Sequence, residues 1–200
     1  MYTTTTPARI DSSVRHLIES LAPGGQASYL DVRPEPGAAF DGCFSNVRAK
    51  SERDGGRMLC GWQLWEWPRV LVEAEFHAVW LSPGGQMEEI TPKRHGETSV
   101  LFVPDERCGY EGKVVDNVRV PLDDDQLIHH FIRVSRAIVE ASADGTRAGD
   151  RPKRIASLRR AQRFVGHSIH AGLREHDPCL CGSGSRYRRC HGCELERALG

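Results

Sequence analysis

The chain has 200 residues, of which 39% are hydrophobic and 27% are charged, a balance that excludes a low-complexity or disordered chain. The sequence lacks the run of about 18 apolar residues that a membrane-spanning helix needs, and its polar first ten residues do not form an export signal. We therefore expect a cytoplasmic protein with no membrane partner, one core of ordinary size and a small appendage. In that compartment the seven cysteines should stay reduced, so their clustering indicates metal binding or catalysis rather than a disulfide framework, and their odd number agrees with that.

The formal net charge of zero is the sum of two oppositely charged parts. Residues 147–200 hold 12 Arg and Lys against 5 Asp and Glu, whereas residues 1–146 hold 15 against 22. A basic part of this kind binds RNA or an acidic protein surface, but arginines on the solvent side of a helix give the same count. Aromatic residues do not interleave with the arginines, so the solvated helix is the preferred interpretation and no specific DNA binding is expected.

Two helices are predicted in the first 60 residues. The first spans residues 11–21, because Asp11 is a favourable capping residue and apolar residues recur at helical spacing before Pro23-Gly24-Gly25. A loop is expected to follow it. The second spans residues 42–52, ends before Asp54-Gly55-Gly56 and places Cys43 at a helix N-terminus.

An antiparallel meander is predicted for the middle of the chain. Its strands are rich in Trp, Val and Phe and are separated by turns that contain Pro and Gly. Together with the two helices they give an α+β domain, in which the N-terminal helices pack on the sheet. The strands span residues 58–67, 70–81, 87–91 and 99–103, and residues 114–120 form a further strand.

The last third is predicted to be helical up to a short Cys-rich segment. A helix spans residues 123–143, with acidic residues at its start and a buried apolar stripe. Residues 143–150 form a linker, and an arginine-rich helix spans residues 152–175. The expected division is an α+β domain of residues 1–146, a basic linker helix of residues 147–176 and a metal-binding knuckle of residues 177–193.

Two pairs of metal-binding side chains stand close together near the C-terminus. Two thiols one residue apart are followed, after eight intervening residues, by a thiol next to an imidazole. Such a set fits a closed tetrahedral zinc site, and the glycines between the pairs allow a tight turn. A segment this short cannot bury enough apolar area to fold alone, so we expect one structural zinc ion per chain to hold it. The predicted ligands are Cys179, Cys181, Cys190 and His191.

The same segment, Asp177-Pro-Cys-Leu-Cys-Gly-Ser-Gly-Ser-Arg-Tyr-Arg-Arg-Cys-His-Gly192, resembles the SEC-C motif, a small zinc element appended to many otherwise unrelated bacterial proteins. The shared features are Cys-x-Cys, Gly-Ser-Gly, Tyr187, two basic residues and Cys-His. Leu180 stands where the family often has proline, and Cys193 is an extra thiol able to compete with His191. The resemblance implies zinc and a protein or ribosome partner. It implies no reaction, because the motif is an accessory element.

Cys43 is the candidate nucleophile. A thiolate at a helix N-terminus is stabilised by free backbone N–H groups and the helix dipole, and the same N–H groups bind an oxyanion. A base must come from elsewhere, and the best candidate is His77, which shares one strand face with Glu73 and Glu75. Three ligands along one strand face are too widely spaced for a single ion, which argues against a second metal site there.

The predicted turn after Leu81 indicates which residues orient the base. If Leu81 pairs with Met87, Thr91 lies opposite His77 on the next strand, and Glu89 lies diagonal to it on the same face. Either Glu89 or Thr91 is then placed to orient the imidazole.

A Cys at a helix start, a His on a following strand and an acidic or polar residue on the next strand occur in this order in transglutaminase-like and related papain-like amidohydrolases. Residues 43–92 resemble that arrangement, although Glu89 stands where such enzymes more often have Asp or Asn. The resemblance implies a papain- or transglutaminase-like fold. It also implies attack of a thiolate on an amide carbonyl of a protein or peptide substrate, and release of the acyl-enzyme by water or an amine.

The predicted function is a cysteine-dependent amidohydrolase, meaning a peptidase, deamidase or acyl transferase, with a zinc motif that docks it to a partner. The alternative is a non-catalytic zinc-binding adaptor that binds a protein or the ribosome. Free cysteines are often buried and strand histidines are common, so Cys43 and His77 are compatible with both. Cys60 and Cys108 are expected to be structural, because no base or helix start lies near them in the sequence.

Overall fold

The computed structural model describes residues 4–143 and 150–199 of the chain, which has a mixed α and β fold. Its internal contacts divide it into two compact units. No helix in the described ranges is long and apolar enough to span a membrane. The sheet unit consists of Thr4–Glu66 and Val72–Val120, and the helical unit consists of Trp67–Leu71 and residues 121–199.

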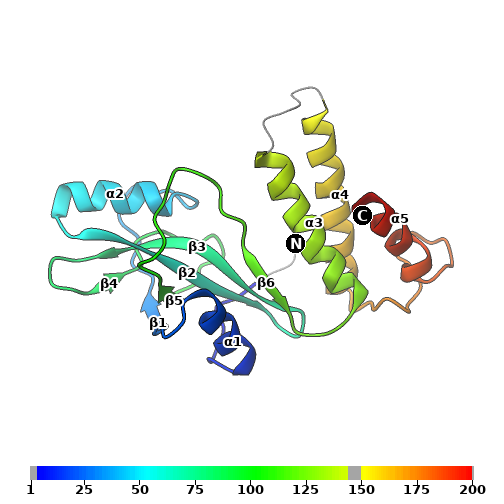
Figure 1. The fold of residues 1–200 in the computed structure, drawn as a ribbon, viewed down its shortest axis with the longest axis horizontal. Helices are drawn as coiled ribbons and strands as arrows, with labels where there is room; N and C mark the ends of the chain where they lie inside the picture. Colours follow the sequence, from blue (N-terminus) through cyan, green and yellow to red (C-terminus); the bar gives the residue numbers. More distant parts are fainter. Residues whose placement is uncertain (1–3, 144–149, 200) are drawn as a thin grey trace. The chain divides into compact units, whose positions relative to one another are not determined.

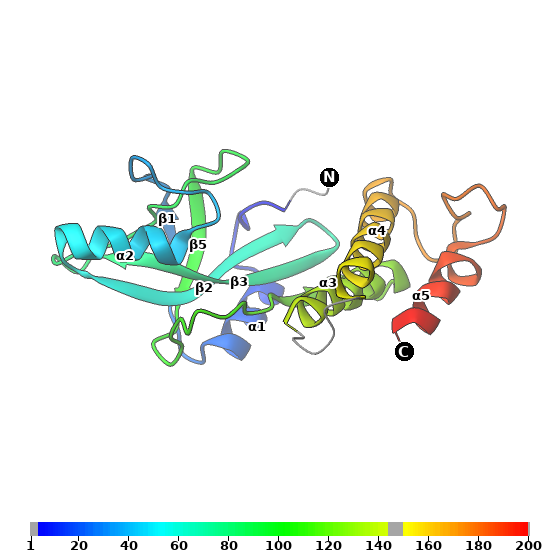
Figure 2. The same ribbon diagram turned by 90° about the horizontal axis from the view of Figure 1, so that it is seen from above.

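The sheet unit is built on a single sheet (Figures 1 and 2). The strands found among the described residues are β1 (Ser28–Asp31), β2 (Arg57–Trp67), β3 (Leu71–Leu81), β4 (Met87–Glu88), β5 (Ser99–Pro104) and β6 (Val118–Pro121). Their order is β1-β5-β2-β3-β4, and β6 pairs with β3 beside this path. The pairs β1 with β5, β5 with β2 and β3 with β4 are antiparallel.

The predicted meander is correct for β2, β3 and β4 but wrong for β5. β5 pairs with β2 and β1 instead of continuing from β4. Consecutive strands usually pair, but β4 has only two residues and offers β5 little to pair with. β1 falls where the sequence predicts a loop, because its four residues bury only Leu30 and form no apolar run. The predicted register is confirmed, since Leu81 pairs with Met87.

The sheet curls until its two ends meet, which makes it nearly barrel-like. Val32, just after β1, forms a parallel bridge with Glu89, just after β4. The backbone N–H of Arg33 donates to the carbonyl of Glu89 at 2.8 Å, and that of Glu35 donates to the carbonyl of Ile90 at 3.0 Å. Closure of the sheet therefore fixes the backbone of Glu89.

The first predicted helix is confirmed as α1 (Ser12–Leu21). One carboxylate oxygen of Asp11 accepts hydrogen bonds from the backbone N–H groups of Ser13 and Val14, each at 3.0 Å. The apolar stripe that predicted the helix is its buried face, which contains Val14, Leu17 and Ile18.

The second predicted helix is confirmed as α2 (Cys43–Asp54), and Cys43 is its first residue. Val47 is the buried residue of this helix, and it packs against Ala78 and Trp80 of β3. Figure 1 shows α2 along one side of the sheet and α1 on the other. The position of Cys43 therefore depends on how α2 is held against the sheet.

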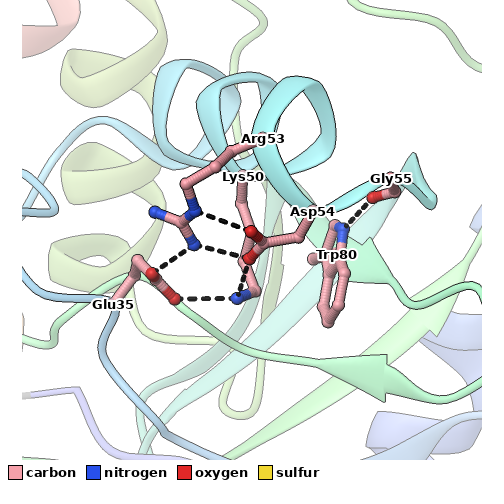
Figure 3. A network of polar contacts seen from close by, with 6 residues as sticks. All are labelled: Glu35, Lys50, Arg53, Asp54, Gly55 and Trp80. Carbon is pink, nitrogen blue, oxygen red and sulfur yellow. Dashed lines mark hydrogen bonds and ion pairs between the residues drawn. The ribbon is translucent and has the colours of Figure 1, made fainter.

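Charges and one aromatic ring hold the C-terminal end of α2 (Figure 3). Lys50 Nζ donates to Glu35 at 2.9 Å and to Asp54 at 3.0 Å, and it lies 4.4 Å from the centroid of the Trp80 ring. Trp80 Nε1 donates to the carbonyl of Gly55 at 3.0 Å. The hydrogen bond from Lys50 is the largest of the causes that hold the pKa of Glu35 below its usual value. This network joins the helix to β3 and to the segment after β1.

We expect Lys50→Met to lower the unfolding temperature by a few degrees, because it removes two ion pairs and the cation–π contact at once. Lys113→Met is the matched control, since Lys113 is exposed and its ion pair with Glu111 is long, at 3.6 Å. Thermal unfolding followed by circular dichroism measures both variants. Equal shifts would show that the network does not hold α2.

The helical unit has a core of its own. Its elements are α3 (Gln126–Ala143), α4 (Arg151–His170), the 3-10 turn η1 (Tyr187–Arg189) and α5 (His191–Leu199). Apolar side chains of these helices pack against Trp67, Val70 and Leu71 from the hairpin between β2 and β3. The ring of Trp67 meets Phe131 of α3 edge-on, with centroids 5.5 Å apart. These hairpin residues are therefore part of the helical core.

The predicted helices are present, but their end residues differ from the prediction. α4 ends at His170, five residues earlier than predicted. Gly172 follows with a φ of +79°, a left-handed conformation in which an α-helix cannot continue. α5 was not predicted, because its nine residues begin inside the expected metal-binding segment. The linker predicted for residues 143–150 lies almost wholly at residues 144–149, outside the described residues.

The boundary predicted at residue 146 lies outside the described residues and stays a prediction, while the contacts of the described residues show how α3 is grouped. α3 belongs with α4 and α5 rather than with the sheet, because its Leu127, Ile128 and Phe131 pack with Val165 and Tyr187. The amphipathic pattern of α3 indicates that one face is buried, but it does not indicate which element covers that face. The chain therefore changes unit near Pro121.

Candidate functional site

The structure brings Cys43, His77 and Glu89 together in the sheet unit. Cys43 is half-buried at the start of α2, His77 lies in β3 with 4% of its surface exposed, and Glu89 is fully buried just after β4. Nε2 of His77 and Oε2 of Glu89 are 2.6 Å apart. The His77 side chain also interacts with the Cys43 thiol, for which the second ring nitrogen, Nδ1, is available.

His77 is charged at neutral pH. Burial by itself lowers the pKa of an imidazole, but the charge of Glu89 and the contacts with Cys43 and Glu89 outweigh burial and raise the pKa of His77 to about 9. Burial has the opposite effect on a carboxyl group, yet attraction to His77 and Lys93 outweighs it and lowers the pKa of Glu89. The buried pair is therefore an imidazolium and a carboxylate at pH 7.

Three groups hold the carboxylate of Glu89. His77 bonds to Oε2, Lys93 Nζ lies 3.1 Å from the same oxygen, and the backbone N–H of Thr91 donates to Oε1 at 2.7 Å. The hydroxyl of Thr91 in turn accepts from Nδ2 of Asn46, in α2, at 3.3 Å. Of the two residues that the sequence leaves open as the orienting group, Glu89 contacts the imidazole and Thr91 supports Glu89.

Lys93 and Gln63 extend the cluster beyond the residues predicted from the sequence. The Lys93 side chain is 7% exposed, and its Nζ donates to Oε1 of Gln63 at 2.8 Å. Gln63 is fully buried in β2, and Nε2 of this residue has no hydrogen-bond partner among the described residues. Two signals in the sequence point to them: an amide inside the apolar strand Met58–Trp67, and a lysine four residues after Glu89.

Cys60 and Cys108 have surroundings that disfavour a thiolate. Burial raises the pKa of both thiols, and the carboxylate of Asp105, 3.2 Å from the Cys108 sulfur, raises that of Cys108 further. Cys60 lies within β2 and Cys108 follows β5, so neither stands at a helix N-terminus. Both thiols are suited to act as internal references for the reactivity of Cys43.

Aromatic rings lie next to Cys43. Phe44, the next residue in α2, stacks on Tyr110 with ring centroids 3.8 Å apart and planes inclined by 5°. Phe40, three residues before the thiol, is 52% exposed, and the guanidinium of Arg94 lies 5.5 Å from its ring centroid. The half-buried thiol is thus flanked in the chain by aromatic surface.

The four predicted metal ligands form a cluster in the helical unit. Their ligand atoms all lie within 4.8 Å of one another. Cys179 Sγ and Cys190 Sγ lie 3.3 Å and 3.5 Å from His191 Nδ1, and Cys181 Sγ lies 3.5 Å from Cys190 Sγ. Metal bonds of about 2.3 Å to sulfur and 2.0–2.1 Å to nitrogen give tetrahedral edges of about 3.6–3.8 Å. The spacing of the Cys3His cluster is therefore compatible with a tetrahedral metal ion.

Backbone bonds form the turn that gathers these ligands. Pro178 and Arg186 form an antiparallel bridge, and the N–H of Cys179 donates to the carbonyl of Ser185 at 2.8 Å. Gly182 and Gly184 between the pairs have φ of +77° and +73°, which favour glycine. The predicted role of these glycines is confirmed.

Neighbouring helices hold the knuckle in the helical unit. Phe164 of α4 stacks on the ring of His191, with centroids 4.3 Å apart. The buried Tyr187 hydroxyl bonds to Nδ1 of His130 at 2.8 Å, and Nε2 of His130 bonds to Glu196 of α5 at 2.7 Å. The tyrosine of the motif is therefore tied to α3, an anchor that the motif alone does not predict.

Cys193, the extra thiol near the knuckle, lies outside the cluster. The cluster of potential ligands in the described chain consists of Cys179, Cys181, Cys190 and His191 alone. The sulfur of Cys193 instead accepts from the Arg197 guanidinium at 3.1 Å. Cys193 and Arg197 are four residues apart in α5, so they lie on the same face of the helix.

Residues 177–192 match the family model of the SEC-C motif, and this match confirms the resemblance seen in the sequence. The match covers only the knuckle and does not assign the rest of the chain to a family. No curated protein and no solved structure matches the chain. The transglutaminase-like resemblance and the papain-like fold therefore receive no support from known proteins.

We expect the purified protein to contain one tightly bound metal ion per chain, because four donors close the coordination sphere. The double variant Cys179→Ser, Cys181→Ser should lose it, whereas Cys193→Ser should keep it. Elemental analysis by mass spectrometry after exhaustive dialysis measures the content. Full retention in the double variant would show that the ligand set is wrong.

Proposed function

We propose that the sheet unit is a cysteine-dependent amidohydrolase, that is, a peptidase, deamidase or acyl transferase acting on a protein or peptide. Cys43 is the nucleophile, His77 the general acid and base, and Glu89 the group that orients His77. One observation carries the proposal: a half-buried thiol at a helix N-terminus interacts with a buried imidazole, and Nε2 of that imidazole lies 2.6 Å from a buried carboxylate oxygen.

The buried charges near Cys43 suit a nucleophile that becomes negative during attack. Glu89 contributes one negative charge, and His77 and Lys93 contribute one positive charge each, so the buried group is left with one positive charge. Negative charge that develops on the Cys43 sulfur during attack is attracted to that positive charge and to the N-terminus of α2.

The helix start also provides donors for the oxyanion that forms during attack. The thiolate adds to the carbonyl carbon of the amide, and the carbonyl oxygen takes up the negative charge. The first hydrogen bond of α2 runs from the N–H of Asn46 to the carbonyl of Gly42 at 2.8 Å. The N–H groups of Phe44 and Ser45 precede it and are therefore free of intrahelical bonds.

Proton transfer by His77 completes both halves of the reaction. The imidazolium gives its proton to the leaving amine, and a thioester at Cys43 and a neutral imidazole remain. The imidazole then takes a proton from water or from an amine, which attacks the thioester and releases the acid or the new amide. The thiolate and the imidazolium are restored, and Glu89 keeps its charge throughout.

We further propose that the metal in the Cys3His cluster is zinc and that its role is structural. Three thiols and an imidazole are the donor set that zinc prefers, and a closed set of four leaves no position for a substrate. The knuckle then serves to dock a protein or the ribosome. A non-catalytic adaptor with the same knuckle is the alternative, and the reactivity of Cys43 decides between them.

Iodoacetamide at pH 7 should label Cys43 well before Cys60 and Cys108, whose thiols have raised pKa values and serve as internal controls. His77→Ala should slow the labelling of Cys43 and leave the other two unchanged, because it removes the counter-charge of the thiolate. Peptide mass spectrometry at a series of times measures all three rates.

Formation of a thioester separates an enzyme from an adaptor with a reactive thiol. Addition of p-nitrophenyl acetate should release about one equivalent of nitrophenol in a burst and acetylate Cys43, and His77→Ala should slow the later turnover by about 10²–10⁴-fold. Labelling of Cys43 no faster than that of Cys60 would favour the adaptor.

Lys93→Met should raise the pKa of His77 further above about 9, because the positive charge of Lys93 opposes protonation of the imidazole. Lys93→Arg is the matched control, since it keeps the charge beside Glu89. Titration of the His77 ring by nuclear magnetic resonance measures both. An unchanged pKa in Lys93→Met, with the wild-type fold retained, contradicts this assignment of the cluster's charges.

A further inference from the structure

We propose that the first two thirds of α4 bind the phosphate backbone of double-helical RNA, without regard to base sequence. This function is separate from the thiol chemistry and from the metal cluster. It rests on the charge, exposure and shape of one surface, which we call the α4 arginine face and define as Lys153, Arg159, Arg160 and Arg163.

α4 is strongly basic over a short length. Residues 151–163 contain five arginines and one lysine and no acidic residue. At 1.5 Å per residue these cations lie along about 18 Å of helix. A density of positive charge this high is matched by a polyanion, because double-helical nucleic acid has one phosphate per about 1.7 Å of axis.

The α4 arginine face points away from the core of the helical unit. Val165 and Ile169 form the buried side of α4. At 100° per residue, all four cations of the face lie within an arc of about 120° on the other side of the helix. All four are exposed. The face is therefore open to a partner.

Within the described part of the chain, three arginines of this face lack a polar partner. Some arginines elsewhere in the chain are paired, as Arg119 is with Glu73 at 2.5 Å and Arg133 with Glu196 at 2.7 Å. Arg159, Arg160 and Arg163 have no ion pair or hydrogen bond among the described residues. Three unpaired guanidinium groups within five residues repel one another, and an anionic partner relieves that repulsion.

A shallow groove runs along this face. Its volume is about 540 Å³, and Ile155 and Ala156 contribute apolar side chains to its lining. The side chains that line it are Arg151, Pro152, Ile155, Ala156, Arg159, Arg160 and Arg163. The guanidinium groups that line the groove are planar donors, each able to bind a phosphate through two hydrogen bonds.

The composition of the face favours a duplex backbone over bases or single strands. It has no aromatic side chain on which an unpaired base could stack. Gln162, an amide able to read a base edge, is already bonded to Ser135 at 2.8 Å. In double-helical RNA the major groove is deep and narrow, so phosphates of two strands lie close enough to meet arginines clustered within one turn.

The test is binding of the full-length protein to a fluorescent 24-base-pair RNA duplex, followed by anisotropy over a range of salt concentrations. We expect the affinity to fall linearly with salt on a logarithmic plot. The triple variant Arg159→Gln, Arg160→Gln, Arg163→Gln should reduce the slope by about 2 to 3, since each lost phosphate contact removes about 0.9. The corresponding Arg→Lys triple variant should keep most of the slope.

The matched control is Arg9→Gln, Arg15→Gln, Arg48→Gln, which removes the same charge from exposed positions of the sheet unit. It should leave the slope unchanged. Equal effects of both triple variants would overturn the proposal, since binding would then follow net charge. Tighter binding to single-stranded RNA, to a DNA duplex or to polyglutamate would also overturn it, and in the last case the face would serve an acidic protein.

Discussion

The buried carboxylate of Glu89 is the group on which the sheet unit depends most. The backbone of Glu89 closes the sheet through the bridge to Val32 and the hydrogen bond from the N–H of Arg33. Its side chain is bonded to His77 and Lys93 at the same oxygen. An isolated carboxylate in a protein interior is very unfavourable, so the cations around it are a requirement of folding. The fold and the candidate site therefore share one electrostatic constraint.

Local patterns predicted the elements well, and the pairing of distant segments poorly. α1 and α2 follow from capping and stop residues, and the pairing of Leu81 with Met87 follows from a short turn. The position of β5 between β1 and β2 could not be predicted from such local signals. It depends on β1, a strand of four residues with one buried side chain. The elements that pack on α3 could not be predicted either, since a stripe of apolar residues shows that a face is buried but not which element buries it.

The sequence predicted the residues of the metal cluster more completely than those of the cluster around Cys43. The metal cluster is a contiguous motif, so its four ligands could be named from spacing alone. The thiol cluster joins residues from α2, β2, β3 and the segment after β4, and the sequence predicts only those of a familiar chemical type. Lys93 and Gln63 were missed because a lysine and a glutamine are usually exposed, and only their burial beside Glu89 gives them a role.

Trp67, Val70 and Leu71 make the core of the helical unit discontinuous in sequence. The chain passes between the two units at Glu66, at Leu71 and again near Val120. A gene fragment that starts after residue 120 would encode the helices without three of their core side chains. Such a fragment would expose the apolar surface that these three side chains cover, so the helical unit needs the five-residue hairpin segment Trp67–Leu71 to complete its core.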